Sequence, residues 1–185
     1  MSAAASLDQW LERVAAGERL SADDLRALAA TPDILQVGML ADAARRRRHG
    51  TRVTYVRLAT YPIDAVPSVD TTLAREIRLT GAPASLGAAL TAVEQGRRVA
   101  GTRTLSACSW LDIERLAASD GASTTDVARR LKQAGLDRLA ELPADRVASL
   151  GAALDALGAA GFAGLTVTIE QALPEDRVGA LLSIA

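Results

Sequence analysis

The chain has 185 residues, with 21 Lys or Arg and 22 Asp or Glu, and a formal net charge of −1. This balance provides no general electrostatic field that would steer nucleic acid or an anionic membrane to the protein, so we expect neither as a partner. The sequence contains one cysteine, Cys108, and one histidine, His49, which excludes an internal disulfide and a histidine-rich metal site.

The N-terminal stretch MSAAASLDQW lacks the basic region and the apolar core of a secretory signal. No uninterrupted apolar run approaches the roughly 20 residues that span a bilayer. Together with the single cysteine, these features predict a cytoplasmic protein. The length fits one domain, residues 1–185, because bodies of this size bury about 70% of their unfolded surface.

The N-terminal residues predict a segment of three helices. Ser6 begins a capping-box pattern, and Ser21 precedes acidic residues that are typical of a first helical turn. For the third helix we expect Thr31 as the cap and Pro32 at the first helical position.

The run from Arg45 to Arg48 lies in the last turn of this third helix, before a stop at Gly50. Cations in that position complement the carbonyl end of the helix dipole, which favours a structural role for the run. A patch that binds nucleic acid is the alternative interpretation.

From Arg52 onward, short apolar strands alternate with capped helices. Parallel strands need crossover connections, so this alternation predicts parallel βα units. The predicted strands are residues 53–58, 76–80, 103–107, 136–139 and 165–169. The predicted helices begin at Ser85, Ser109 and Thr124, a longer one spans residues 144–160, and stops lie at Gly96, Gly135 and Gly161.

A complete (β/α)₈ barrel needs eight strands and typically about 250 residues. Since about five strands are found here, the predicted fold class is α/β, an incomplete (β/α) barrel of about five parallel strands. The partial barrel is expected over residues 51–185, after a helical segment over residues 1–50.

The turn LTGAPAS places Gly81 just after the second strand and Ser85 before the next helix. Such a turn can offer backbone N–H groups to an anion. It has neither GxGxxG nor P-loop spacing, so an ordinary strand-to-helix turn is the simpler interpretation. Cys108 ends the third strand, and without a nearby histidine we interpret it as a small buried hydrophobe.

Three carboxylates follow strand ends and are candidates for binding a ligand. Asp112 lies in the first helical turn after the third strand, where the helix dipole alone would explain it. Glu141 follows the fourth strand. Glu170 and its neighbour Gln171 follow the fifth strand, where loop solvation explains them equally well.

Several stretches resemble the radical S-adenosylmethionine enzymes of the futalosine route to menaquinone, particularly aminofutalosine synthase, and their relatives in deazaflavin cofactor synthesis. The stretch RLSADDLRALAATPDILQVGMLADAARRRRHGTRVTYV is similar to the helices that lead into the first barrel strand of that family. RLTGAP looks like its Gly-Gly-x-x-Pro turn. ASDGASTTDVARRLKQAGLDRL and GFAGLTVTIEQALPEDRVGALL resemble later barrel units, so that the likeness covers most of residues 18–182 in order.

The sequence departs from that family at the iron–sulfur site. The family carries CxxxCxxC after its first strand, because three thiolates hold a [4Fe–4S] cluster and leave one iron free for S-adenosylmethionine. The corresponding stretch here, LATYPIDAVPSVDTTLA, contains no cysteine. We therefore expect no cluster and no other cofactor, and S-adenosylmethionine is not the favoured ligand. The loop is interpreted as the remnant of an active-site loop.

The resemblance transfers few site residues. Gly81 matches the turn that would face the amino group of S-adenosylmethionine, and Asp112 matches a carboxylate of the third-strand loop. Glu141 and Glu170 depart from the family's patterns and are kept only as pocket candidates.

The leading functional prediction is a truncated, catalytically inactive relative that acts by binding, in or near menaquinone biosynthesis. Its expected partners are a second copy of itself, a related barrel protein or a nucleoside-like small molecule, because open strand edges must be paired or covered. The alternative is a cluster-independent enzyme or binder whose pocket at the barrel mouth uses carboxylates such as Asp112 or Glu170 for acid–base chemistry. A structural remnant without a ligand is a third possibility.

Overall fold

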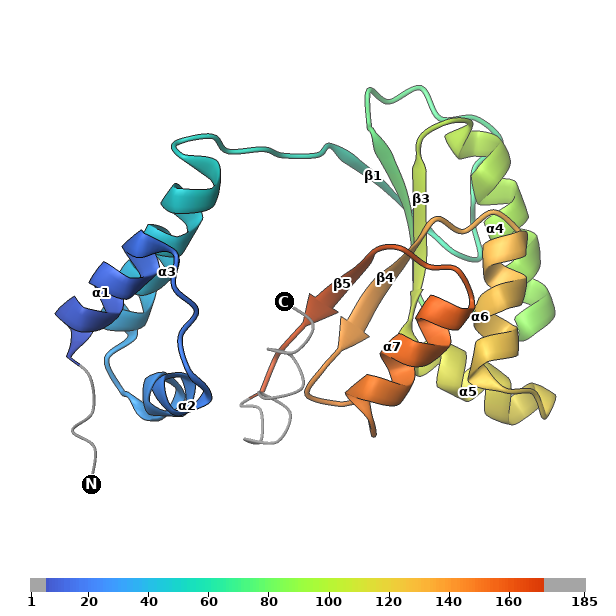
Figure 1. The fold of residues 1–185 in the computed structure, drawn as a ribbon. Coiled ribbons are helices and arrows are strands. Elements are labelled where there is room, and N and C mark those ends of the chain that lie inside the picture. The colour runs from blue at the N-terminus through green and yellow to red at the C-terminus, as the bar shows by residue number, and fades with distance from the viewer. Residues whose placement is uncertain (1–5, 172–185) are drawn as a thin grey trace. The chain divides into compact units, whose positions relative to one another are not determined.

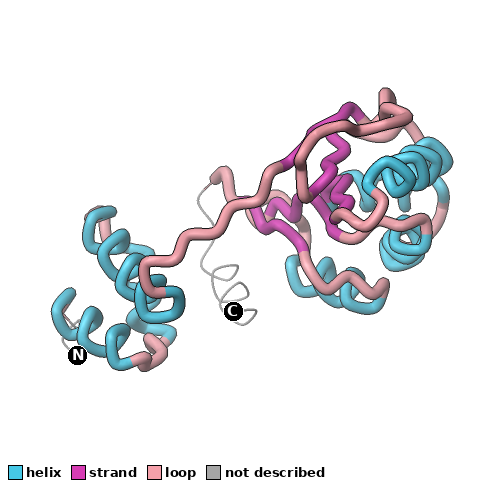
Figure 2. The backbone as a smooth tube through the Cα atoms, turned by 90° about the horizontal axis from the view of Figure 1, so that it is seen from above, coloured by secondary structure: helices cyan, strands magenta, loops and turns pink. Residues whose placement is uncertain are grey.

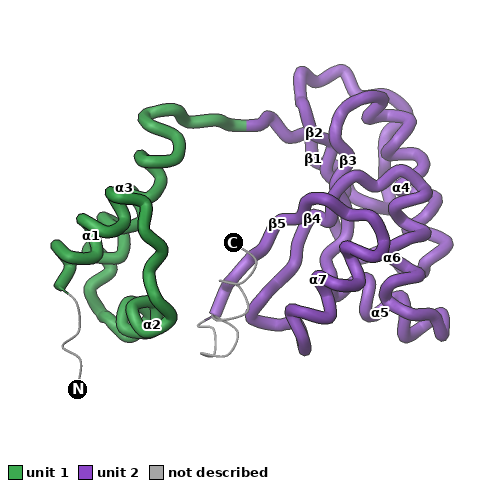
Figure 3. The backbone as a smooth tube through the Cα atoms, in the orientation of Figure 1, with its two compact units in different colours: residues 1–55 green, residues 56–185 purple. Residues whose placement is uncertain are grey.

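The computed structural model of the protein describes residues 6–171, whose contacts separate into two units (Figure 3). The first unit comprises residues 1–55 and the second residues 56–185. The expected division after residue 50 falls close to this boundary. That the whole chain forms one domain stays a prediction.

The first unit contains three helices, as expected from the sequence (Figure 1). Their bounds are α1 Leu7–Ala16, α2 Ala22–Ala30 and α3 Ile34–His49. Complete capping boxes form at Ser6 and Ser21. The cap of α3 is Asp33 and not Thr31, because the Asp33 carboxylate accepts hydrogen bonds from two backbone N–H groups of the first turn. A carboxylate forms a stronger, charge-assisted cap than a hydroxyl.

Side chains join the three helices through Asp24 and Arg47. The Asp24 carboxylate accepts from Trp10 Nε1 at 2.9 Å and from Arg13 Nη1 at 2.9 Å, which connects α2 to α1. Arg47 donates to the carbonyl oxygens of Ala15 and Ala16, at 3.1 and 3.2 Å. One arginine of the basic run therefore caps the end of a neighbouring helix.

The second unit is an α/β structure built on a five-stranded sheet in which every neighbouring pair is parallel. The strand order follows the chain, and over the described residues the sheet is open (Figure 1). The strands are β1 Leu58–Pro62, β2 Glu76–Thr80, β3 Thr104–Ser109, β4 Arg138–Pro143 and β5 Leu165–Thr168. The coarse prediction of five parallel strands is confirmed.

The first strand lies later in the chain than predicted. Residues 53–56 lie outside the strand ladder, and Val53 and Tyr55 are 81% and 84% exposed. Strand β1 begins at Leu58 because its ladder partner, Glu76, is the first residue of β2. The propensity of the earlier residues for β structure is not sufficient without a neighbouring strand.

Four helices follow the strands: α4 Leu86–Ala100, α5 Trp110–Asp120, α6 Thr124–Gln133 and α7 Leu150–Ala159. The predicted caps Ser85 and Ser109 are confirmed, whereas α6 is capped by Ser123 instead of Thr124. The last helix is shorter than predicted, because residues 144–146 form a turn and Ser149 is the cap.

The predicted stop at Gly96 is wrong, since this glycine lies inside α4. A Cβ atom at this position would approach Leu105 Cδ1 to 3.0 Å and Leu79 Cδ1 to 3.1 Å. Glycine therefore allows the helix to pack closely on β2 and β3.

In the second unit the helices lie on one face of the sheet, as the view from above also shows (Figure 2). Alternate strand residues such as Ile77, Leu79 and Leu105 point to this face and are almost fully buried. The residues between them, including Arg78 and Ser106, belong to the opposite face, which is polar. Among the described residues, no helix is long and apolar enough to cross a membrane.

Candidate functional site

The connection between β1 and β2, residues 63–75, belongs to the stretch that was interpreted from the sequence as the remnant of an active-site loop. It contains no helix and is held by the carboxylate of Asp70, whose side chain has no exposed surface. Asp70 Oδ1 accepts from the Tyr61 hydroxyl at 2.7 Å and from the Thr72 N–H at 3.0 Å, while Oδ2 forms an ion pair with Arg103. The Tyr61 hydrogen bond, followed by that from Thr72, holds the pKa of Asp70 well below its usual range.

The same loop is also attached to helix α4. Arg103 donates to the carbonyl oxygens of Val99 and Ala100 at the end of this helix, and Gln95 Nε2 donates to Pro67 O at 3.1 Å. A connection fastened in this way serves as the crossover between two parallel strands.

Cys108 is 4% exposed and adopts a φ of +58° at the end of β3. Burial, together with the charge of Asp112, raises the pKa of its thiol to about 12. The thiol is therefore neutral at physiological pH and is a poor nucleophile or metal ligand. Over residues 6–171 the structure contains no group of three or more His, Cys, Asp or Glu that could hold a metal ion.

A cavity of about 470 Å³ lies at the carboxyl ends of β2 to β5. Parallel strands bring their carboxyl ends to one edge of the sheet, where ligands bind in many α/β proteins. The cavity lining includes Arg78, Thr80, Gly81, Asp112, Glu141 and Thr168. We call this space the carboxyl-end cavity.

Three of the four predicted site residues line the carboxyl-end cavity. Gly81 has a φ of +97° in the turn after β2. Asp112 Oδ2 accepts from the N–H and the hydroxyl of Ser109, at 2.9 and 3.0 Å, so that its carboxylate completes the capping box of α5. Glu141 Oε1 accepts from Thr168 Oγ1 at 2.9 Å.

Glu170 does not line this cavity. It is exposed, and its backbone N–H donates to Asp145 Oδ2 at 3.4 Å, as does the N–H of Gln171 at 3.1 Å. The chain turns after β5 and directs Glu170 elsewhere, although it follows its strand as the other candidates follow theirs.

Sequence reasoning missed a polar cluster formed by Glu76, Arg78 and Ser106. Ser106 Oγ donates to Glu76 Oε1 at 2.6 Å, and Arg78 donates to both residues, through Nε to Ser106 at 3.2 Å and through Nη2 to Glu76 at 3.0 Å. The alternation of polar and apolar residues in EIRLT was the available signal, since a parallel strand covered on both faces would be apolar throughout.

The carboxyl-end cavity combines one guanidinium, two carboxylates and several hydroxyls. None of its described lining residues is aromatic. Such a lining recognises a small ligand through hydrogen bonds and charge rather than by stacking on a ring. Hydroxyls donate to both carboxylates, Ser109 to Asp112 and Thr168 to Glu141, but the Ser109–Asp112 pair forms the capping box of α5. None of the described lining residues is a histidine that could act as the base of a catalytic triad.

A comparison of the chain with models of known protein families gives no match, and a comparison with curated proteins gives none either. The relationship to radical S-adenosylmethionine enzymes therefore stays a prediction that rests on the stretches quoted above.

Proposed function

We propose that this protein is a cluster-free relative of the radical S-adenosylmethionine barrels that acts by binding, as a pocket protein or partner subunit connected with menaquinone biosynthesis. In this proposal the open sheet of the second unit is an incomplete (β/α) barrel. The strand order β1 to β5 and the helices on one face agree with the first part of such a barrel.

The observation that carries the proposal is the meeting of Gly81, Asp112 and Glu141 on one cavity. Gly81 follows β2, Asp112 lies in the first turn of α5 after β3, and Glu141 lies inside β4, two residues before the strand ends. They share the cavity with Arg78. Meanwhile the sequence has no second or third cysteine to hold a cluster, and its β1–β2 loop is fastened down by Asp70. Binding without radical chemistry accounts for both features.

The ligand that fits this lining is small and polar. Glu141 and Asp112 favour ligand groups that donate hydrogen bonds, such as the hydroxyls of a sugar or an amine. A nucleoside-like molecule would satisfy this requirement through its ribose.

Acid–base catalysis by Glu141 is a second candidate function. Within residues 6–171, only one of its two carboxylate oxygens, Oε1, has a hydrogen-bonding or ionic partner, from Thr168 and Arg146. Oε2 is therefore available to a ligand proton. Asp112 is less suited to this role because Oδ2 accepts two hydrogen bonds within its own capping box.

Calorimetric titration with S-adenosylmethionine, adenosine, futalosine-like nucleosides and quinone precursors tests the proposal. We expect at least one of these to bind, and Glu141→Gln to weaken it about tenfold, the loss of one charge-assisted hydrogen bond. Glu94→Gln on the exposed side of α4 is the matched control and should bind as the wild type does. Turnover of a bound compound would favour the enzyme, and no binding by any compound would contradict both the pocket protein and the enzyme.

A further inference from the structure

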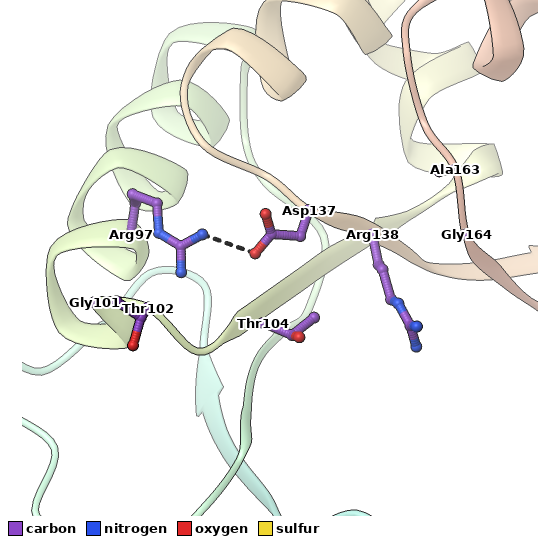
Figure 4. A pocket seen from close by; sticks show the side chains of 8 residues that line it. All are labelled: Arg97, Gly101, Thr102, Thr104, Asp137, Arg138, Ala163 and Gly164. Atoms are coloured by element: carbon purple, nitrogen blue, oxygen red, sulfur yellow. Dashed lines mark hydrogen bonds and ion pairs between the residues drawn. The ribbon is translucent and has the colours of Figure 1, made fainter.

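A second cavity, of about 380 Å³, lies at the amino ends of β3 and β4 and shares no lining residue with the carboxyl-end cavity. Figure 4 shows the side chains around it. The residues that line it include Arg97, Thr102, Thr104, Asp137, Arg138 and Gly164. We call this space the amino-end cavity.

One side of the amino-end cavity is electrically balanced. Arg97 Nη1 donates to Asp137 Oδ2 at 2.7 Å, and Figure 4 shows the two side chains pointing toward one another. Asp137 Oδ2 also accepts from the N–H of Leu105 at 2.8 Å. Arg97 Nε, in contrast, is buried and has no hydrogen-bond partner among the described residues.

The other side presents donors that lack acceptors. Arg138 is exposed, and within residues 6–171 its guanidinium has no hydrogen bond or ion pair. The hydroxyls of Thr102 and Thr104 likewise have no partner in that part of the chain. Since Arg97 and Asp137 cancel, Arg138 leaves the cavity with an excess of one positive charge.

The strand register places two of these donors together. Ser106 of β3 lies opposite Arg138 of β4, and Thr104 is two residues before Ser106. Side chains two residues apart in a strand, and those opposite one another on neighbouring strands, share a face of the sheet. Arg138 and Thr104 therefore belong to the same face. Gly164 leaves room beside them, since a Cβ atom there would lie 3.4 Å from Arg138 Nε.

The end of helix α4 does not oppose an anion in this cavity as strongly as a free helix end would. The exposed carbonyls of a last turn carry partial negative charge. Here the carbonyl oxygens of Val99 and Ala100 are already bonded to Arg103, and that of Arg97 to the Gly101 N–H.

The geometry points to an oxyanion site in the amino-end cavity, where Arg138 and the hydroxyl of Thr104 bind a phosphate group, free or esterified. Guanidinium and hydroxyl donors are the usual partners of phosphate oxygens. The volume lies at the small end of the range for ligand cavities, which suits a small phosphorylated molecule as well as inorganic phosphate.

The test is calorimetric titration of the full chain with inorganic phosphate and with glycerol phosphate, at an ionic strength fixed with chloride. We expect saturable binding to the wild type and about tenfold weaker binding to Arg138→Gln. Thr104→Val should weaken binding to a smaller extent. Arg98→Gln is the matched control, because Arg98 bonds Gln95 on the exposed surface of α4.

Tighter binding of the ester would assign the site to a phosphorylated molecule, and tighter binding of the free ion to inorganic phosphate. Thermal melting without phosphate should show equal stability of the Arg138→Gln and wild-type proteins, since Arg138 is exposed. Absence of saturable binding for both compounds, or equal losses in Arg98→Gln and Arg138→Gln, would overturn the assignment.

Discussion

Asp70 holds the connection between β1 and β2 in place. Its carboxylate joins Tyr61 at the end of β1 to Arg103 before β3 and is fully enclosed. Loss of this charge would leave the Arg103 guanidinium without its counterion in a partly buried place. The loop is thus held by one ionised group.

This leads to a prediction for the pH dependence of stability. The pKa of Asp70 is lowered in the folded state, so the carboxylate stabilises the fold above its unfolded pKa of about 3.9. This contribution is lost as the pH falls from there through the folded pKa. Urea unfolding should show Asp70→Asn to be less stable than the wild type at pH 7, with a smaller difference at pH 3.

Asp64→Asn changes an exposed carboxylate in the same loop and is the control for this experiment. It should unfold like the wild type at both pH values. Equal differences between Asp70→Asn and the wild type at pH 7 and pH 3 would show that the charge of Asp70 is not what holds the loop.

At the scale of the element, the contact of α4 with the sheet depends on Gly96. Replacement by alanine would add helix propensity of about 1 kcal/mol but would press a methyl group against Leu79 and Leu105. Overpacking of this kind costs about 1–3 kcal/mol. We expect Gly96→Ala to lower the free energy of unfolding by about 1 kcal/mol, measured by urea denaturation.

Gly158 provides the matched comparison, because it lies in α7 and a Cβ atom there meets nothing within 4 Å. Gly158→Ala should raise the free energy of unfolding by about 0.5 kcal/mol. A gain in both variants would mean that α4 does not need glycine for its packing.

The helices and strands show which structural features can be predicted from the sequence. The caps at Ser6, Ser85 and Ser109 were predictable because each bonds a backbone N–H within its own first turn. The position of β1 was not, since it depends on Glu76, which is remote in sequence. Gly96 was misread for the same reason, because its role depends on side chains of two strands.

In the candidate site, too, features that depend on residues remote in sequence could not be predicted. Gly81, Asp112 and Glu141 could be grouped from the rule that parallel strands end at one edge. The same rule wrongly placed Glu170 in the cavity, because the backbone after β5 turns toward Asp145. The partners of Ser106 depend on cross-strand register, which no local pattern specifies.

At the scale of the whole molecule, the edges of the sheet predict association. Among the described residues, β1 pairs only with β2 and β5 only with β4. Exposed strand edges tend to pair with another chain, and a symmetric dimer is the commonest closed arrangement. Light scattering over a concentration series should therefore show a dimer in equilibrium with the monomer.

Val167→Lys tests the β5 edge, where this side chain is 38% exposed. A lysine near its symmetry mate should raise the dissociation constant about tenfold or more. Val69→Lys, at a position of the β1–β2 loop where the side chain is 70% exposed, is the control and should leave association unchanged. A monomer at all concentrations would contradict association.

The whole molecule is also expected to hold no iron–sulfur cluster, because one cysteine cannot replace three. After anaerobic reconstitution with iron and sulfide, metal analysis and absorption spectra should show no stoichiometric [4Fe–4S] centre. A stoichiometric cluster, or reductive cleavage of S-adenosylmethionine, would contradict this expectation.

The central claim is that a small polar ligand binds at the carboxyl ends of the strands. Titration of the ¹⁵N-labelled protein with adenosine, followed through backbone amide shifts, tests it most directly. We predict saturable shifts at Gly81, Ser109 and Thr168, with Thr102 and Gly164 of the amino-end cavity unaffected. Saturable shifts confined to residues outside the carboxyl-end cavity, or no shifts at all, would contradict the account.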